Sequence, residues 1–265
     1  MGCMRQTPTP FVTEVMNGFT PVKNQGKSQT CWAYAMLAAI ETEHIMRGDS
    51  VHLSPAFVEK KMDSDSRAPK SKRGMGQTLL NLIQRDGIVG YDAMRTVDVP
   101  APKYVFMYGA QYTPIEFAHS VCAPDEYIAL TTTGEAPYGE WVELDVPDNW
   151  EHNQFLNIPA DSLLERVEYA VRHHHGVCWE GDTSERGFSF EKGIAELSLI
   201  NGRTTDDHCM SIVGIAHDQE GKRFFIMKNS WGKKNPYGGL MYMSFDYFMA
   251  KTIAVYLTQE AYKGR

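Results

Sequence analysis

Apolar positions recur with a helical period in four parts of the chain. From Cys31 to Ile40 nearly every residue is apolar, mostly Ala, Leu and Met, which predicts a helix buried on all sides. Thr30 is placed to cap the start of this helix and Gly48 to end it. Shorter helical patterns begin at Ser54 and cover residues 77–85 and 161–175.

The second half of the chain has the patterns of strands. Residues 176–179, 209–216, 224–228 and 240–245 are short apolar or alternating runs that predict strands. Residues 97–159 are rich in Pro, Tyr and Thr, and we interpret them as an insertion of loops and short strands. We therefore expect one α+β domain over residues 1–265, with a helical lobe at about 22–125 and a β lobe at about 1–21 and 126–265.

Composition excludes several classes of protein. The 265 residues are 43% hydrophobic and 22% charged, which is typical of a folded globular chain. The net charge of −7 argues against nucleic acid as a partner, because phosphate binding needs a basic surface. The longest apolar run is too short to span a membrane. The first residues lack the apolar stretch of a signal peptide, which favours the cytoplasm, whereas prior removal of a signal would indicate a secreted or periplasmic protein.

Five cysteines without a CxxC pair do not suggest a disulfide framework. We interpret Cys3 as a leftover of processing. Cys31 is different, because it stands where a polar loop enters the first turn of the predicted long helix. Free N–H groups and the helix dipole favour the thiolate at that position, and the thiolate is the nucleophilic form. Position alone favours a buried structural cysteine over a nucleophile, since free cysteine is among the most buried residue types.

A nucleophilic thiolate needs a base and a group that orients the base. His208 stands at the start of an apolar strand, and Asn229 follows another strand together with Ser230 and Trp231. An amide oxygen can accept the imidazole N–H and fix its tautomer, and an indole can shield that bond from water. His208 and Asn229 are therefore the candidate base and orienting group.

Three blocks resemble the signatures of papain-like cysteine peptidases, namely residues 25–35 around Cys31, Asp207-His208, and Asn229-Ser230-Trp231-Gly232. The resemblance implies a two-lobe fold with a helical lobe, an antiparallel β-barrel-like lobe and the active cleft between them. It further implies that Cys31 is the nucleophile, His208 the acid and base and Asn229 the orienting group. Gln25 and the Cys31 N–H would form the oxyanion hole, and Trp231 and Trp32 would support the site.

The bleomycin hydrolase and aminopeptidase C branch is the part of this family that the chain resembles further. Residues 75–89, 125–130 and 177–182 carry this similarity. The branch implies aminopeptidase action and allows an oligomer. Its C-terminal arm enters the cleft, whereas residues 255–265 of this chain are brief and polar.

Substrate contacts are expected from the same resemblance. Gly74-Met75-Gly76 aligns with the segment that lines the substrate, and Glu180 with the pocket for the second residue before the scissile bond. Glu180 would there favour a basic or polar side chain, or it would simply face solvent. The candidate substrate-binding residues are Met75, Gly76, Trp179, Glu180, Asp207 and Cys209. Asp206 or Asp207 could also stabilise protonated His208 or pair with a lysine.

We expect no metal, because His173-His174-His175 point in different directions on a helix and no spaced ligand set exists. No organic cofactor is needed either. The predicted activity is hydrolysis of peptide or protein substrates through a thioester. Two alternatives stay open, namely an amidase or acyl transferase using the same triad, and a peptide-binding module without catalysis.

Overall fold

The 16-residue helix α1 (Cys31–Met46) is buried along most of its length, as its apolar sequence predicts. It is followed by Arg47 and by Gly48 at φ +94°, so the predicted glycine ends the helix. Thr30 does not cap the helix with its side chain. Its hydroxyl instead donates a hydrogen bond to the Glu59 carboxylate (3.0 Å), a stronger acceptor supplied by the next helix.

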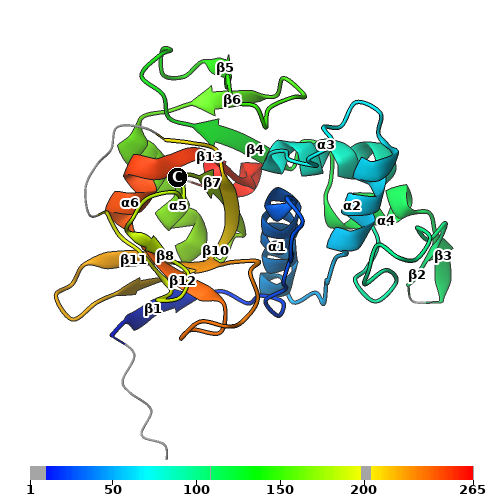
Figure 1. Cartoon of the computed structure of the whole chain (residues 1–265), viewed down its shortest axis with the longest axis horizontal. Helices are drawn as coiled ribbons and strands as arrows, with labels where there is room; N and C mark the ends of the chain where they lie inside the picture. Colours follow the sequence, from blue (N-terminus) through cyan, green and yellow to red (C-terminus); the bar gives the residue numbers. More distant parts are fainter. Residues whose placement is uncertain (1–9, 108, 198–203, 265) are drawn as a thin grey trace, which may run out of the picture.

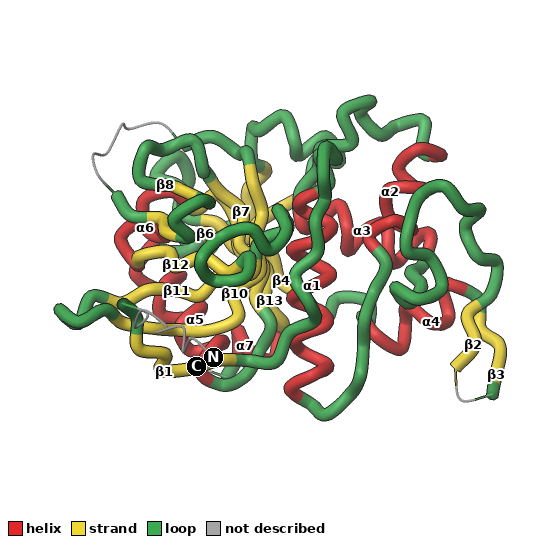
Figure 2. The backbone as a smooth tube through the Cα atoms, turned by 60° about the horizontal axis from the view of Figure 1, so that its bottom comes forward, coloured by secondary structure: helices red, strands yellow, loops and turns green. Residues whose placement is uncertain are grey.

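This structure is a computed structural model that describes residues 10–107, 109–197 and 204–264. Cys3 lies outside the described residues. Three helices follow α1 on one side of it, and the strands of the large sheet lie on its other side (Figures 1 and 2). These helices are α2 (Pro55–Ser64), α3 (Gly76–Asp86) and α4 (Pro114–Val121). Ser54 caps α2 by accepting the Phe57 N–H at 3.1 Å.

One mixed, mostly antiparallel sheet forms the rest of the fold, in the order β5-β6-β4-β13-β7-β10-β11-β12-β9-β8, with β1 paired to β10. As described, this sheet does not close into a barrel. Its strands are β1 (Val12–Met16), β4 (Tyr127–Thr131), β5 (Trp141–Glu143), β6 (Gln154–Asn157), β7 (Val177–Gly181), β8 (Phe188–Ser189), β9 (Ile194–Ala195), β10 (His208–His217), β11 (Arg223–Lys228), β12 (Leu240–Ser244) and β13 (Thr252–Thr258). A separate hairpin joins β2 (Val105–Met107) to β3 (Ala110–Tyr112).

The central strands bury both of their faces. On β7, Cys178 packs in the core shared with α1, whereas Val177 and Trp179 pack in a second core on the opposite face. The second core is covered by α5 (Ala160–Arg172) and α6 (Phe245–Lys251), and α7 (Gln259–Lys263) follows β13. The α+β class is thus observed, and the division into lobes at residues 22 and 125 stays a prediction.

Two segments differ from the sequence predictions. Residues 97–159 contain α4 and the fully buried strand β4, so interpreting them as loops and short strands was incomplete. The C-terminal segment is not a polar arm, because residues 252–258 form β13 between β4 and β7. The apolar side chains of this strand pack into both cores, which explains why a short, partly polar tail is ordered. No helix in the described ranges is long and apolar enough to cross a membrane.

Candidate active site

Cys31, His208 and Asn229 meet where α1 packs against β10. Cys31 is the first residue of α1, His208 is the first residue of β10, and Asn229 directly follows β11. Antiparallel pairing of β10 with β11 brings the last two to the same end of the sheet. The Nε2 of His208 lies 2.8 Å from the Asn229 Oδ1. Because an amide oxygen only accepts, Nε2 carries the proton, which leaves Nδ1 to exchange a proton with Cys31.

The bond between His208 and Asn229 is shielded from water. The Trp231 ring lies 4.4 Å from the His208 ring, centroid to centroid, at a tilt of 31°. Only 3% of His208 and 2% of Asn229 is exposed. Asn229 Oδ1 also accepts the Ser230 N–H at 2.7 Å, so the amide cannot turn without losing two bonds. The imidazole is therefore held in one orientation.

Cys31 has the character of an activated thiol. Contact with the Cys209 thiol and with His208 lowers the pKa of Cys31 well below its usual value, against the opposing effect of burial. Burial, and then the same contact, raise the pKa of Cys209, so the negative charge rests on Cys31. Burial raises the pKa of Cys122 to about 12 and the pKa of Cys178 well above its usual value. Of the four cysteines in the described ranges, Cys31 is the one that becomes a thiolate.

Gln25 is fixed in the loop before α1. Its Nε2 donates to the Ser28 carbonyl (2.7 Å), and its Oε1 accepts the Ser230 hydroxyl (2.6 Å). Its backbone N–H also donates to the Ser230 carbonyl, at 2.8 Å. These bonds leave the second N–H of the Gln25 amide for another acceptor. This is what an oxyanion donor requires.

Two indoles hold the segment that precedes α3. Trp32 is fully buried and its Nε1 donates to the Lys72 carbonyl (3.0 Å), while the Trp150 Nε1 donates to the Arg73 carbonyl (3.1 Å). Met75 is buried in the core beside α1. The Gly76 N–H donates to Glu180 Oε2 at 3.3 Å and is therefore not free to pair with a substrate backbone.

The structure separates the remaining candidate substrate residues. Trp179 lies in the second core, where its Nε1 donates to the Thr252 hydroxyl (2.8 Å), so it is not brought to Cys31. Asp207 accepts the Thr183 N–H (2.8 Å) and the Thr183 hydroxyl (2.7 Å), and it pairs with no lysine in these bonds. Glu180 is fully buried, so the solvent-facing interpretation was wrong. Cys209, the last of these candidates, contacts the Cys31 thiol.

Sequence reasoning missed Arg73, Asp148 and Tyr256. Arg73 forms a two-nitrogen pair with the Asp148 carboxylate, at 2.8 and 2.7 Å, and also bonds the Asp206 backbone carbonyl. Tyr256 donates to Glu180 Oε2 at 2.7 Å. The run of five apolar residues from 253 to 257 was the signal for a strand that would carry Tyr256, whereas nothing local indicates the partners of Arg73.

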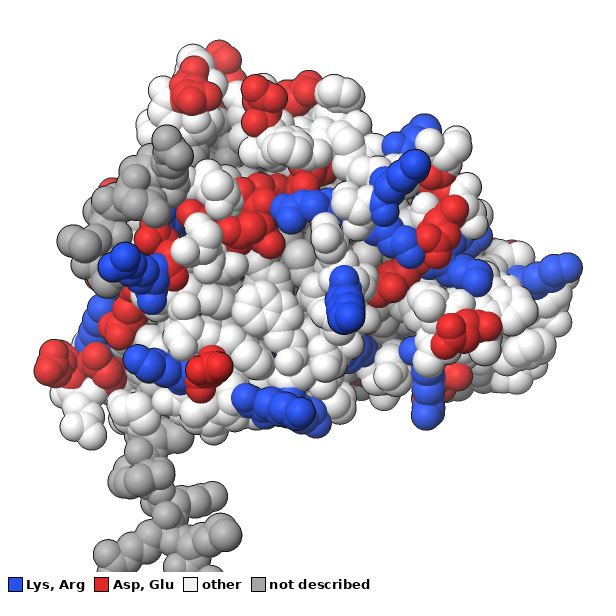
Figure 3. Space-filling view, in the orientation of Figure 1, with Lys and Arg blue, Asp and Glu red and all other residues white. Residues whose placement is uncertain are grey.

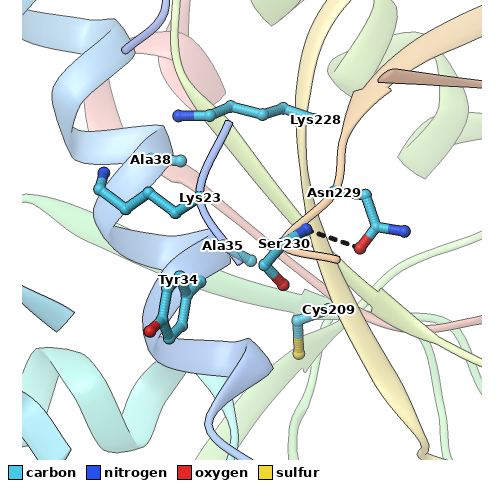
Figure 4. Close-up of a pocket in the computed structure, with 8 residues that line it drawn as sticks. All are labelled: Lys23, Tyr34, Ala35, Ala38, Cys209, Lys228, Asn229 and Ser230. Carbon is cyan, nitrogen blue, oxygen red and sulfur yellow. Dashed lines mark hydrogen bonds between the residues drawn. The ribbon is translucent and has the colours of Figure 1, made fainter. Parts of the chain in front are cut away.

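A small pocket lies behind the amide of Asn229, between α1 and the end of β11 (Figure 4). Lys23 and Lys228 border it on one side and Cys209 on the other. Burial lowers the pKa of Lys228 to about 8, while Glu41 opposes that effect. The Lys228 Nζ bonds the Thr20 hydroxyl (2.8 Å) and lies 3.7 Å from Glu41 Oε2. Lys23, Lys228 and Glu41 thus form a charged cluster that supports the side of the active site next to Asn229.

The three adjacent histidines have three different partners. The ring of His173 faces the Tyr169 carbonyl, His174 faces Asn17, and His175 faces Glu43. Within the part of the chain that the structure describes, no group of three or more His, Cys, Asp or Glu side chains is arranged to hold a metal ion.

Comparisons with known proteins agree with this geometry. The family model described as "Papain family cysteine protease" matches residues 12–259. Aminopeptidase G of Lactobacillus delbrueckii subsp. lactis is 26% identical over 160 residues, which are 51% of this chain and 36% of that protein. Cathepsin J of Rattus norvegicus is 25% identical over 232 residues, which are 86% of this chain and 57% of that protein. The chain thus spans less than two thirds of the length of these relatives.

Solved structures share the fold. PepW from Lactobacillus rhamnosis superposes with a TM-score of 0.71 at 16% identity, covering 96% of this chain and 83% of that one. The bromelain protease from Ananas comosus superposes with a TM-score of 0.53 at 17% identity, covering 94% and 99%. The expected two-lobe fold is confirmed, and the match to aminopeptidase G agrees with the expected branch.

Proposed function

The chain belongs to the papain family of cysteine proteases, and from this premise we propose that it hydrolyses peptide bonds through Cys31, His208 and Asn229. One observation carries the proposal. Of the four described cysteines, the thiol with the lowered pKa is the one that contacts His208, whose ring is fixed by Asn229 at 2.8 Å. A nucleophile, a base and an orienting group therefore occur in one chain of contacts.

The proposed reaction proceeds in two steps. The Cys31 sulfur attacks the carbonyl carbon, and the Cys31 N–H and the Gln25 amide stabilise the oxyanion. Protonated His208 then donates its proton to the departing amine, which leaves a thioester on Cys31. In the second step His208 removes a proton from water, the resulting hydroxide attacks the thioester, and the carboxylic acid product leaves. The fixed amide of Asn229 keeps the imidazole aligned in both steps.

Within this chemistry we propose aminopeptidase action. The support is the similarity to aminopeptidase G and to aminopeptidase E of Lactobacillus helveticus, which is 24% identical over 161 residues. These matches cover 51% of this chain in each case. The same active site would then release single residues from the N-terminus of a peptide.

The Cys31→Ala variant tests the proposed function. We expect peptide hydrolysis to fall by at least about 10³-fold, because the nucleophile is removed while orientation and binding stay. Product formation from a mixture of unblocked peptides is measured by mass spectrometry. Cys122→Ala is the matched control, because Cys122 is a buried thiol outside the site and its loss should leave hydrolysis intact. A Cys31→Ala protein that still cleaves these peptides would overturn the assignment.

A further inference from the structure

Two cysteines face each other at the active site, Cys31 on α1 and Cys209 on β10. Ala35 and Ala38 lie four and seven residues after Cys31, so they share its face of the helix. The Cys209 side chain lines the small pocket together with these two alanines, and Cys31 packs against the same hydrophobic core as Cys209. In Figure 4 the Cys209 sulfur points along α1 in the direction from Ala38 to Ala35, which is the direction of Cys31. Cys209 therefore faces the start of α1.

The two sulfurs are in hydrogen-bonding contact at this place. The contact lowers the pKa of Cys31, whereas burial, and then the contact, raise the pKa of Cys209. One sulfur is therefore a thiolate and the other a protonated thiol. A thiolate is the form that peroxides oxidise, and a neighbouring thiol is the group that converts the oxidised sulfur into a disulfide.

An oxidant reaches Cys31 before it reaches Cys209. Cys31 is partly exposed, whereas Cys209 is only 2% exposed. Hydrogen peroxide carries no charge and needs no charged path, and Figure 3 shows that the middle of the face in view, over β10 beside α1, is mostly uncharged. Cys209 needs no access of its own, because its sulfur already contacts that of Cys31. Burial of Cys209 thus assigns the first oxidation to Cys31.

The other two described cysteines are not placed for this role. The Cys178 sulfur lies 4.0 Å from the Trp179 carbonyl oxygen. Cys122 follows α4 and lines a different pocket, together with side chains of α3. Burial raises the pKa of both thiols, so neither competes as a thiolate. Of the four cysteines in the described ranges, Cys209 is the one whose thiol contacts Cys31.

We propose that hydrogen peroxide oxidises Cys31 and that Cys209 then closes a disulfide with it, which switches the active site off reversibly. Cys209 is the resolving cysteine in this scheme. The disulfide removes the nucleophile while it lasts, and it keeps Cys31 from further, irreversible oxidation. This inference goes beyond the proposed function, because the bond can form whether or not the chain cleaves peptides.

The oxidation proceeds in two balanced steps. The Cys31 thiolate attacks one oxygen of hydrogen peroxide, the O–O bond breaks, and hydroxide leaves. Sulfur is oxidised to a sulfenic acid and the peroxide is reduced. The Cys209 sulfur then attacks the Cys31 sulfur, and the S–O bond breaks as the S–S bond forms. The thiol proton of Cys209 passes to the departing hydroxide, which leaves as water.

Peptide mass spectrometry of the oxidised wild-type protein tests the inference. The protein is treated with a small excess of hydrogen peroxide, its remaining thiols are blocked with iodoacetamide, and it is digested without reductant. We expect the peptides that contain Cys31 and Cys209 to be joined, lighter than their sum by two hydrogen atoms, in a protein that stays a single chain on non-reducing electrophoresis. Dithiothreitol should then restore most of the reactivity of Cys31 toward iodoacetamide.

Variants assign the second step to Cys209. Cys209→Ser removes the resolving sulfur and keeps a hydroxyl donor beside Cys31, so the sulfenic acid should persist and be trapped by dimedone, which should hardly label the wild type. Longer exposure should carry Cys31 of this variant to the sulfinic acid, from which dithiothreitol recovers little reactive thiol. Cys178→Ala is the matched control, because it removes a buried thiol from the neighbouring strand and should behave as the wild type does.

Three results would contradict the inference. In the wild-type protein, these are Cys31 ending as a sulfinic acid while Cys209 stays a free thiol, and a disulfide from Cys31 to any other cysteine. The third is equal dimedone labelling of Cys31 in the wild type and in Cys209→Ser. The first two results need no variant, so they hold even if Cys209→Ser does not fold. Peptide hydrolysis is not among these readouts, so the proposed function and this inference fail separately.

Discussion

At the scale of single residues, the charge on Cys31 depends on a neighbour as well as on its base. The first cause of its lowered pKa is contact with Cys209, and His208 contributes after that. A thiol that donates to a thiolate stabilises the charged form, as any hydrogen-bond donor does. Cys209 stays protonated because burial raises its own pKa.

Replacement of Cys209 by alanine should raise the pKa of Cys31. The expected result is that alkylation of Cys31 by iodoacetamide reaches half of its maximal rate at a higher pH than in the wild-type protein. Peptide mass spectrometry resolves Cys31 from the other thiols. Cys178→Ala is the control, since Cys178 is buried on β7 and should leave the midpoint in place. Equal midpoints in all three proteins would remove Cys209 from the account.

Sequence reasoning succeeded for residues whose role follows from local position. Cys31 at a helix start, and His208 and Asn229 at strand ends, could be proposed because the chemistry needs those groups at those places. It failed for Tyr256, whose role arises from its contact with Glu180 across the paired strands β13 and β7. Such contacts depend on the register of β7 against β10 and β13, which no single segment specifies.

At the scale of elements, a glycine sets how closely α1 approaches β7. A Cβ at Gly176 would lie 1.9 Å from the Ala39 carbonyl oxygen, and the Gly176 N–H donates to the buried Glu43 carboxylate (2.9 Å). Helix and strand therefore meet with backbone against backbone. Because α1 carries Cys31 and β7 carries Glu180, this contact positions both.

Gly176→Ala should lower the free energy of unfolding by about 1–3 kcal/mol, the usual cost of forcing extra volume into a packed core. The urea midpoint measures this loss. Gly134→Ala is the matched control, because an added Cβ there meets nothing within 4 Å, and its midpoint should hardly move. A similar midpoint for both variants would show that the α1 and β7 contact tolerates a side chain.

Elements whose apolar residues follow a regular pattern could be predicted from the sequence. Elements that form only because other parts of the fold bury them could not. The starts of α1 and α2 followed from the apolar pattern and the Ser-Pro pair. The strand β13 was missed because its apolar residues are divided between two faces and flanked by polar ones. Burial on both sides makes it a central strand, and this is visible only when β4 and β7 are in place.

At the scale of the whole molecule, a buried charge cluster joins α1 to the sheet. Glu41 on α1 is fully buried, and it accepts the Leu53 N–H (2.7 Å) and lies near Lys23 (3.3 Å) and Lys228 (3.7 Å). Lys228 ends β11 and immediately precedes Asn229. The cluster therefore connects the helix that carries the nucleophile to the strand that orients the base.

Glu41→Ala should lower the free energy of unfolding by about 3–5 kcal/mol, because it leaves the Lys228 ammonium buried without its partner. Glu14→Ala removes a carboxylate from an exposed cluster with Arg172 and His217 and should cost less than about 1 kcal/mol. Denaturant unfolding of both variants at pH 7 gives the comparison. A loss for Glu41→Ala as small as that for Glu14→Ala would mean that the cluster does not hold the molecule together.

The central claim, covalent catalysis at Cys31, is tested most directly by trapping the acyl-enzyme. The wild-type protein is mixed with an excess of an activated amino-acid ester, quenched with acid within milliseconds to seconds, and digested for peptide mass spectrometry. We predict that the peptide containing Cys31 gains the mass of the acyl group and loses it as hydrolysis is completed. Product formation without an acyl adduct on Cys31, or with the adduct on another residue, would contradict the account.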